Sequence, residues 1–524
     1  MKTFNLNKFH EETKMPGSLI FEFKLGAPQE VAARGSEQAM RILVMGDFSG
    51  RASRALESGA DLATRQIRRI DIDNVEQAPG SLSCALELAL DGPGAAPVRI
   101  GLATFDDFHP DQLYRNPDLF QALAGLRTRL GNPATFAEAA AQLRAGMHLA
   151  SDEPAAATPD ETSNPFVQLL GGNMRHAPHA PEGHGRPVAG GTSGIDAFIK
   201  GIVGSVAGAD PLQSQYIAAA DTLAGDRMRA LLHDPAFRSL EAAWRSLHLL
   251  VTSLELDEQL QVHVLDVSKA ELLADVQAAA ADLPVSGLYR LLVEQARLSP
   301  DSPPWSVLVG NYTFDNSVDD VALLAALGAI GAQAGAPFLA APASGVADSA
   351  ALTALAADPV HWPPTDRDGA ARWLSLRHSG QARWIGLALP HLLLRLPYGK
   401  NTDRIESFNF EELTGLPAHD DYVWGNAAFG CALLLGRSFE QSGWDMQPGD
   451  NLDIADLPAH TCQRDGEAQL QACGGAYLSE RAGAAILRHG PMPLLSFKNR
   501  NAVRLLRFQS IADPVQELAG PWQD

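Results

Sequence analysis

Residues 151–194 divide this sequence into two parts. They are rich in Pro, Gly, Ala, Ser, Thr and His and carry few large apolar side chains, a composition typical of a linker. Regular apolar spacing returns only from about residue 211. Because 524 residues also exceed what one hydrophobic core normally holds, we expect separate folded regions. The sequence therefore predicts a first region at 18–150 and a second region at 211–524, joined by a linker at 151–210.

The first region shows several strand patterns followed by a helical one. An apolar run at 41–50 ends in turn residues, which predicts a buried strand. Isoleucines alternate with charged residues at 68–74, as in a half-exposed strand. Two alternating segments, 81–90 and 97–105, flank a Gly/Pro turn and predict a hairpin. Leucines at helical spacing within 119–130 predict a helix, so this region is expected to be α+β.

In the second region, strand patterns alternate with helical ones. Apolar side chains at spacings of three and four predict two helices separated by a break at 233–235. Strands are predicted at 260–268, 305–314 and 382–390. The uncharged stretch 321–343 is interpreted as a helix and a buried strand, since Gly and Pro interrupt it. The expected fold class is α/β and α+β, with mixed sheets flanked by helices and a mostly parallel core.

Charge, cysteine usage and the N-terminal sequence constrain compartment and partners. The net charge of −21 repels phosphate backbones and argues against nucleic acid. No apolar segment follows the first lysine, so we expect no signal peptide and no membrane insertion. The cysteines are too few for a disulfide scaffold and too widely spaced for a CxxC pair; they are Cys84, Cys431, Cys462 and Cys473. These features predict reduced thiols and a cytoplasmic location.

The motifs of common enzyme classes are missing from the sequence. No Gly-x-Gly-x-x-Gly follows a strand, and the segment at 190–195 does not complete a Gly-x-Ser-x-Gly element. His176, His179 and His184 lie in a segment of linker composition, and we interpret them as solvated rather than as metal ligands. We therefore expect no catalytic residues, no metal and no cofactor.

Acidic residues are numerous, and most are assigned structural roles. Asp106, Asp107 and Asp111 precede a helix, where carboxylates cap free amides and complement the helix dipole. Glu241 is interpreted as a packing or ion-pair group. The others are interpreted as a solvated acidic face, comprising Asp403, Glu406, Glu411, Glu412, Asp420 and Asp421.

From residue 211 onward, a series of motifs resembles one protein family. The segments LLHDPAFRSLEAAWRSLHLLV (231–251), LPHLLLRLPYGKNTDRIESFNFEE (389–412), DYVWGNAAFGCALLLGRSF (421–439) and SGW (442–444) occur in this order. They resemble the large sheath subunit of bacterial type VI secretion systems, TssC or VipB. The resemblance covers about residues 211–510.

The first region resembles a different subunit of the same system. The segments ILVMGDFSGR (42–51), RQIRRIDIDN (65–74) and TFDDFHPDQL (104–113) are similar to the small sheath subunit, TssB or VipA. The two subunits are ordinarily separate chains that form a heterodimer. The sequence thus resembles a fusion of both.

This resemblance implies a structural role. In the family, the two subunits interlock, polymerise into a helical sheath around an inner tube of Hcp, and contract to drive the tube outward. The implied partners are other sheath subunits, the Hcp inner tube, baseplate proteins and the unfoldase ClpV. A catalytic site is not implied.

The resemblance also selects residues for assembly and packing. Under it, the LRLPYG turn ends a core strand, where Pro397 stops the strand and Gly399 relieves the backbone. The aromatic, acidic segment that follows is expected to pack on a neighbouring domain or subunit. The candidates are Asp47, Phe48, Arg395, Pro397, Tyr398, Gly399, Tyr422, Trp424, Asn426, Phe439 and Trp444.

Two alternatives stand beside the sheath component. The family's large subunit continues past the position of LRFQS, whereas this sequence stops at Asp524, so one alternative is a non-polymerising accessory or capping protein built on the sheath fold. The other is an enzyme with a site among His233, Asp403 and His419, which no motif supports. The sheath hypothesis requires that the two regions share a sheet or a packed boundary.

Overall fold

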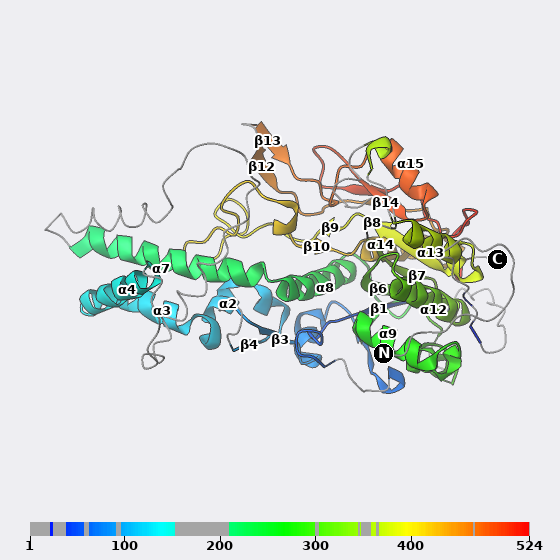
Figure 1. Ribbon diagram of the computed structural model, residues 1–524, viewed down its shortest axis with the longest axis horizontal. Coiled ribbons are helices and arrows are strands. Elements are labelled where there is room, and N and C mark those ends of the chain that lie inside the picture. Colours follow the sequence, from blue (N-terminus) through cyan, green and yellow to red (C-terminus); the bar gives the residue numbers. More distant parts are fainter. Residues whose placement is uncertain are drawn as a thin grey trace.

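A nine-stranded sheet covered by helices forms the centre of the protein (Figure 1). The computed structural model describes residues 21, 23–24, 38–56, 62–90, 96–151, 209–298, 303–343, 346, 358–362, 366–464 and 467–522. The expected linker falls outside the described residues except at its two ends, and the three linker histidines fall outside them as well.

The sheet has the strand order β11-β15-β14-β8-β7-β6-β1-β5-β2. The six strands from β14 to β5 are parallel, whereas β2 pairs antiparallel with β5 at one end, and β15 pairs antiparallel with both β14 and β11 at the other. This arrangement confirms the expected mixed, mostly parallel sheet. The strands are β1 Met40–Gly46, β2 Ile67–Ile70, β5 Leu260–Asp266, β6 Val307–Phe314, β7 Phe338–Pro342, β8 Ile385–Leu389, β11 Asp453–Ile454, β14 Met492–Ser496 and β15 Val503–Leu505.

Strand β1 comes from the first region and lies between β5 and β6 of the second region. All seven of its residues are buried. Because side chains alternate along a strand, Met40, Ile42 and Val44 join one hydrophobic core, while Leu43 and Met45 join the core on the opposite face. A strand buried on both faces explains the uninterrupted apolar run in the sequence.

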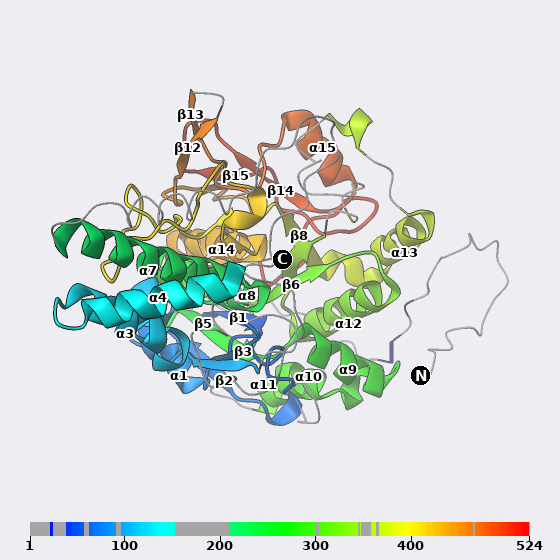
Figure 2. The same cartoon turned by 60° about the vertical axis from the view of Figure 1, so that its left-hand side comes forward.

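Helices cover both faces of the sheet (Figures 1 and 2). On one face lie α8 and α14, whose apolar residues share a core with β1, and on the other lie α9, α12 and α13. The bounds are α8 Pro235–Thr252, α14 Ala427–Ser442, α9 Lys269–Ala279, α12 Val318–Ala334 and α13 Arg367–Arg377. Helix α15, Glu480–Arg488, packs beside β14, and the short helices α10 and α11 cover Gly287–Tyr289 and Gln295–Leu298.

A helical layer extends from one end of the sheet (Figure 1). Helices α3 and α4 of the first region pack against α7 of the second, so that this layer also joins the two regions. The elements are α3 Pro117–Gly131, α4 Phe136–Ser151 and α7 Ala209–Leu232. Nearby lie α1 Ala78–Ser81, α2 Pro110–Arg115 and the antiparallel hairpin of β3 Ala85–Leu88 and β4 Val98–Gly101, as the sequence predicts.

Besides the β3–β4 hairpin, two more two-stranded sheets lie outside the central one in the described part of the chain. Strands β9 Leu392–Leu393 and β10 Trp424–Gly425 form a short antiparallel pair. Strands β12 Thr461–Arg464 and β13 Glu467–Leu470 form a hairpin that stands at the periphery in both views (Figures 1 and 2).

Several expected boundaries are confirmed. The uncharged stretch is a helix followed by a strand, α12 and β7, and Gly335 at φ +69° ends the helix in the left-handed conformation that glycine favours. Among the described residues, no helix has the length and apolarity needed to cross a bilayer. The break at 233–235 separates α7 from α8, whose first amides are capped by Asp234. The strand at 68–74 is shorter than expected, because Asp71 and Asn74 hydrogen bond to each other in a turn.

Candidate functional site, the interlock between the two regions

The contact between the regions begins with the backbone of β1. This strand pairs along its full length with β5 and, through residues 42–45, with residues 307–310 of β6. Removing a strand that is hydrogen bonded on both sides would leave two unpaired edges in a buried sheet. The first region therefore supplies an interior part of the second region's sheet.

A carboxylate of the second region binds the turn that follows β1. Asp266 Oδ1 accepts hydrogen bonds from the backbone N–H groups of Phe48 (2.8 Å) and Ser49 (3.1 Å), and Oδ2 accepts from Ser49 Oγ (2.7 Å). Asp266 is only 8% exposed, and burial raises its pKa, although these donors favour the charged form. Three donors to one buried carboxylate fix the conformation of the turn.

Phe48, one of the predicted residues, also packs against the second region. Its ring meets the Trp244 ring edge-on, with centroids 5.3 Å apart, and Trp244 Nε1 donates a 2.9 Å hydrogen bond to the Phe48 carbonyl. Both side chains are fully buried. This pair joins α8 to the end of β1.

Two arginines of the first region converge on one glutamate of the second. Glu271 accepts hydrogen bonds from Arg51 Nε (2.9 Å) and Nη2 (2.8 Å) and from Arg65 Nη2 (2.9 Å). The same carboxylate caps α9 by accepting from Ser268 N–H (2.9 Å). Burial alone would raise the pKa of Glu271, but the hydrogen bonds from Arg65, Arg51 and Ser268 outweigh burial and lower the pKa to about 2.

Asp47, also predicted, acts within its own turn. Its carboxylate oxygens accept hydrogen bonds from the backbone N–H groups of Arg51 (2.8 Å) and Ala52 (2.9 Å). Asp47 therefore orders the backbone of Arg51, whose side chain makes the contact with Glu271.

A further contact between the two regions joins residues 109–114 to residues 398–412. The Asp111 carboxylate accepts from the backbone N–H groups of Glu406 (3.0 Å) and Ser407 (2.8 Å). Asp111 lies in the first turn of α2 as expected, but its carboxylate extends to the second region, whereas Asp107 caps Thr104 N–H at 2.8 Å. Of the three acids predicted to serve a helix start, Asp106 and Asp107 lie in the first turn of the short helix Phe105–Phe108, where Asp107 makes the cap, whereas the Asp111 carboxylate binds the second region.

A buried ion cluster supports the 398–412 segment. Arg395 donates to Glu241 Oε1 (2.7 Å) and to both oxygens of Glu412 (2.7 and 2.9 Å). Arg245 links Glu241 (2.7 Å) to the hydroxyl of Tyr398 (2.9 Å). The ion-pair role predicted for Glu241 is confirmed.

Glu412 departs from the sequence-based prediction of a solvated acidic face. It is 2% exposed, and its Oε2 also accepts from Tyr398 N–H (2.8 Å). Burial would raise the pKa of Glu412, but the charge of Arg395, the nearby ring of His233 and the hydrogen bonds from Arg395 and Tyr398 lower it to about 2. Glu412 can therefore be buried because Arg395 neutralises its charge.

The predicted roles of Pro397 and Gly399 need correction. Residues 394–397 are not in a strand: the pairing of β9 with β10 ends at Leu393, and β9 lies outside the central sheet. Pro397 thus stops no core strand. Gly399 permits a close approach, since a Cβ atom there would lie 2.3 Å from Glu411 Oε2.

The other candidates pack mainly within the second region. Tyr422 Oη lies 2.7 Å from His460 Nδ1, and Trp424 stacks on His419 at 4.8 Å. Asn426 caps α14 through its Oδ1 and donates to the Tyr312 carbonyl (2.9 Å).

The last two candidates lie near the first region. Phe439 packs edge-on against Trp444 at 5.0 Å, and Trp444 Nε1 donates to the Gln38 carbonyl of the first region (2.5 Å). The structure thus brings Phe48, Tyr398 and Trp444 to the boundary, since Tyr398 also meets the ring of His109 at 5.1 Å.

The sequence analysis did not identify Asp266, Glu271, Trp244, Arg51 or Arg65. One signal was available, because Ser268 and Glu271 have the spacing of a helix capping box. That pattern predicts a helix start but not the two arginines, which lie more than 200 residues away in the chain.

The enzymatic alternative finds little support in the geometry. His233 Nε2 lies 3.6 Å from Glu412, Asp403 pairs through its backbone with Tyr398, and His419 stacks on Trp424. These contacts do not join the three residues into one constellation. Within the described part of the chain, no group of three His, Cys, Asp or Glu side chains is arranged to hold a metal ion.

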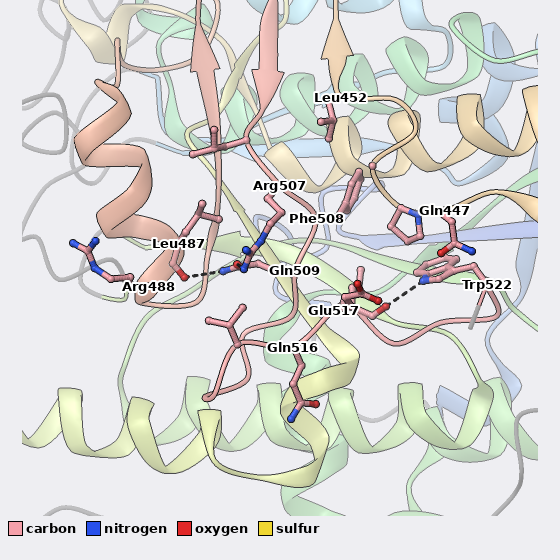
Figure 3. Close-up of a pocket in the computed structure, with 15 residues that line it drawn as sticks. Gln447, Leu452, Leu487, Arg488, Arg507, Phe508, Gln509, Gln516, Glu517 and Trp522 are labelled. Carbon is pink, nitrogen blue, oxygen red and sulfur yellow. Dashed lines mark hydrogen bonds between the residues drawn. The ribbon is translucent and has the colours of Figure 1, made fainter. Parts of the chain in front are cut away.

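A cavity of about 800 Å³ lies between residues 447–452 and 506–522 (Figure 3). Gln509 Nε2 donates to the Leu487 carbonyl (2.8 Å), and Trp522 Nε1 donates to the Leu518 carbonyl (3.1 Å). Histidine, cysteine and serine are absent from its described lining, so this cavity offers no pairing of nucleophile and base.

Two family models match separate parts of the chain. Residues 214–512 match the VipB family model, described as EvpB/VC_A0108, tail sheath N-terminal domain. Residues 27–156 match the model described as Type VI secretion system, VipA, VC_A0107 or Hcp2.

One curated relative is the Type VI secretion system sheath protein TssC1 of Pseudomonas aeruginosa. It is 35% identical over 309 residues, which cover 57% of this chain and 61% of that protein. The chain thus spans about three fifths of the length of this relative. Because the VipB match covers more than half of the sequence, the chain belongs to the VipB tail sheath family of type VI secretion systems.

Proposed function

We propose that this chain is a sheath protomer in which the small and large subunits are fused, and that it polymerises around an inner tube and contracts to propel the tube. The observation that carries the proposal is β1, which the VipA-like region places between two strands of the VipB-like region. A structural role without catalysis accounts for buried charges that serve only to hold segments together.

A head-to-tail contact that does not close into a ring generates a helical filament. Contraction then corresponds to repacking between two lattices of such protomers, a change that stores mechanical work when one lattice is less stable than the other. In this proposal the assembly forms in the cytoplasm, and its further partners are the Hcp inner tube, the baseplate proteins and the unfoldase ClpV.

Electron microscopy of the full chain, alone and co-expressed with the tube protein, tests this function. The proposal predicts tubules or stacked rings, and predicts that Trp244→Ala, which removes a contact between the regions, reduces their number. Single particles of one protomer under both conditions would contradict polymerisation. Recovery from the host at a few copies per assembly would favour the accessory or capping protein instead.

A further inference from the structure

A second surface with the features of a binding site lies at the β12–β13 hairpin. A groove of about 560 Å³ separates β12 from residues 396–417. The groove is preformed, because the hydrogen bond between Tyr422 and His460 (2.7 Å) attaches the base of the hairpin to the segment at β10. Its described lining comprises Leu396, Pro397, Tyr398, Asn401, Thr402, Glu411, Leu413, Gly415, Leu416, Pro417, Ala459, His460, Thr461, Cys462 and Gln463.

One wall of the groove is a free strand edge. Gln471 N–H donates to the His460 carbonyl (2.8 Å), so residues 460 and 471 form a hydrogen-bonded pair. Such pairs alternate along an antiparallel ladder, which makes Cys462 the next hydrogen-bonded position of β12. Thr461 and Gln463 therefore direct their N–H and C=O groups away from β13. In the described residues, β12 pairs with no strand other than β13.

The opposite wall combines apolar and polar side chains. Its leucines and prolines, among them Leu416 at 62% exposure, lie beside Asn401, Thr402 and Glu411. A free edge provides backbone hydrogen bonds to an added strand, while apolar pockets beside it receive alternate side chains. A two-stranded hairpin is marginally stable by itself, so a third strand would also stabilise it.

The charge around the groove is negative. Glu411 is the acidic side chain of the groove's described lining, which includes no lysine and no arginine. The cations of the same segment, Lys400 and Arg404, line a separate cavity of about 400 Å³. This distribution favours a partner with basic side chains.

We propose that the groove binds an extended segment of a partner protein, in which apolar and basic side chains alternate and whose backbone adds to β12 as a third strand. The proposal concerns a partner beyond the sheath contacts described above, and it does not depend on whether the chain polymerises.

Fluorescence polarisation with a labelled nine-residue peptide of alternating lysine and valine tests the proposal on the full chain. We expect saturable binding, and we expect Gln463→Pro to weaken it about tenfold or more, because proline removes an N–H that faces the groove. Gln463→Ala keeps this N–H and should bind like the unaltered chain. Proline at this position removes no bond of the β12–β13 ladder, and an unchanged melting temperature would verify that the variant folds.

Two further comparisons in the same assay test the charge preference of the groove and the role of its leucine side chains. A peptide of alternating glutamate and valine should bind at least tenfold more weakly than the lysine peptide, and Glu411→Gln should reduce this difference. Leu416→Ser should weaken binding of the lysine peptide. Equal affinity of Gln463→Pro and Gln463→Ala, or equal binding of the two peptides, would overturn the proposal. It would also be overturned if the groove proved to hold a second copy of the chain, seen as self-association that Gln463→Pro abolishes while the lysine peptide does not bind.

Discussion

The residues that join the two regions are mostly buried polar or aromatic groups, each bound by partners from the other side of the boundary. Asp266 and Glu271 each accept three or more hydrogen bonds, and Phe48 and Trp244 pair both by ring contact and by hydrogen bond. Loss of one partner leaves a buried group unsatisfied, which costs more than the bond itself contributes. The boundary is therefore expected to be sensitive to single substitutions.

Trp244→Ala should lower the free energy of unfolding by about 3–5 kcal/mol, because it leaves a cavity beside Phe48 and removes a hydrogen bond. Denaturant unfolding measures this change. Leu416→Ala, at an exposed position, serves as the control and should stay within about 0.5 kcal/mol. Similar values for both substitutions would contradict the assigned contact.

The lowered pKa of Glu271 predicts a pH dependence of stability. Its folded pKa of about 2 lies below the ordinary value of 4.5, so its stabilisation is complete above about pH 5 and is lost as the pH falls toward 2. The expected contribution is on the order of 3 kcal/mol at neutral pH. Asp266, whose pKa is raised, acts in the opposite direction.

Unfolding measured between pH 7 and pH 3 should thus show a shallower loss of stability for Glu271→Gln than for the unaltered chain. Glu258→Gln is the matched control, because Glu258 pairs with Arg69 at the surface and is 84% exposed. If both variants follow the same pH profile as the unaltered chain, the two arginines do not hold Glu271 as described.

At the level of elements, the sequence was most informative where a pattern is local. The apolar run of β1, the break before α8 and the succession of α12 and β7 are visible as periodicity or as turn residues. The strands that pair with β1 cannot be identified from the sequence, since β5 and β6 lie more than 200 residues away and an all-apolar strand does not specify its register.

For the segment around Arg395, a local pattern led to a wrong prediction. Its leucines suggest a core strand, yet β9 lies outside the central sheet and its pairing with β10 stops at Leu393. The burial of Glu412 depends on meeting Arg395 in three dimensions, which neither residue reveals in the sequence.

Hydrogen exchange should distinguish the interior strand from the peripheral hairpin. Amides of β1, bonded in the middle of the sheet, should exchange only through global unfolding, whereas those of β12 should exchange through local opening. Mass spectrometry of peptides covering 40–46 and 461–464 measures both rates. Comparable protection of the two segments would contradict the interior position of β1 or the free edge of β12.

For the whole molecule, the central claim is that two regions resembling separate sheath subunits fold as one body around a shared sheet. Strand β1, the helices α3 and α7, and the contacts of Asp111 all cross the same boundary. A covalent connection through residues 151–210 is then unnecessary for holding the folded regions together. It only keeps them at equal stoichiometry and high effective concentration.

Cleavage of the connection tests this claim most directly. A site for a sequence-specific protease is placed within 151–210, and the cut protein is analysed by size-exclusion chromatography with light scattering. We predict that both fragments elute together at the same mass as the uncut protein in its own state of assembly, and separate only in denaturant or when Leu43→Pro interrupts β1. Separation of the unaltered fragments in native buffer would contradict the shared sheet.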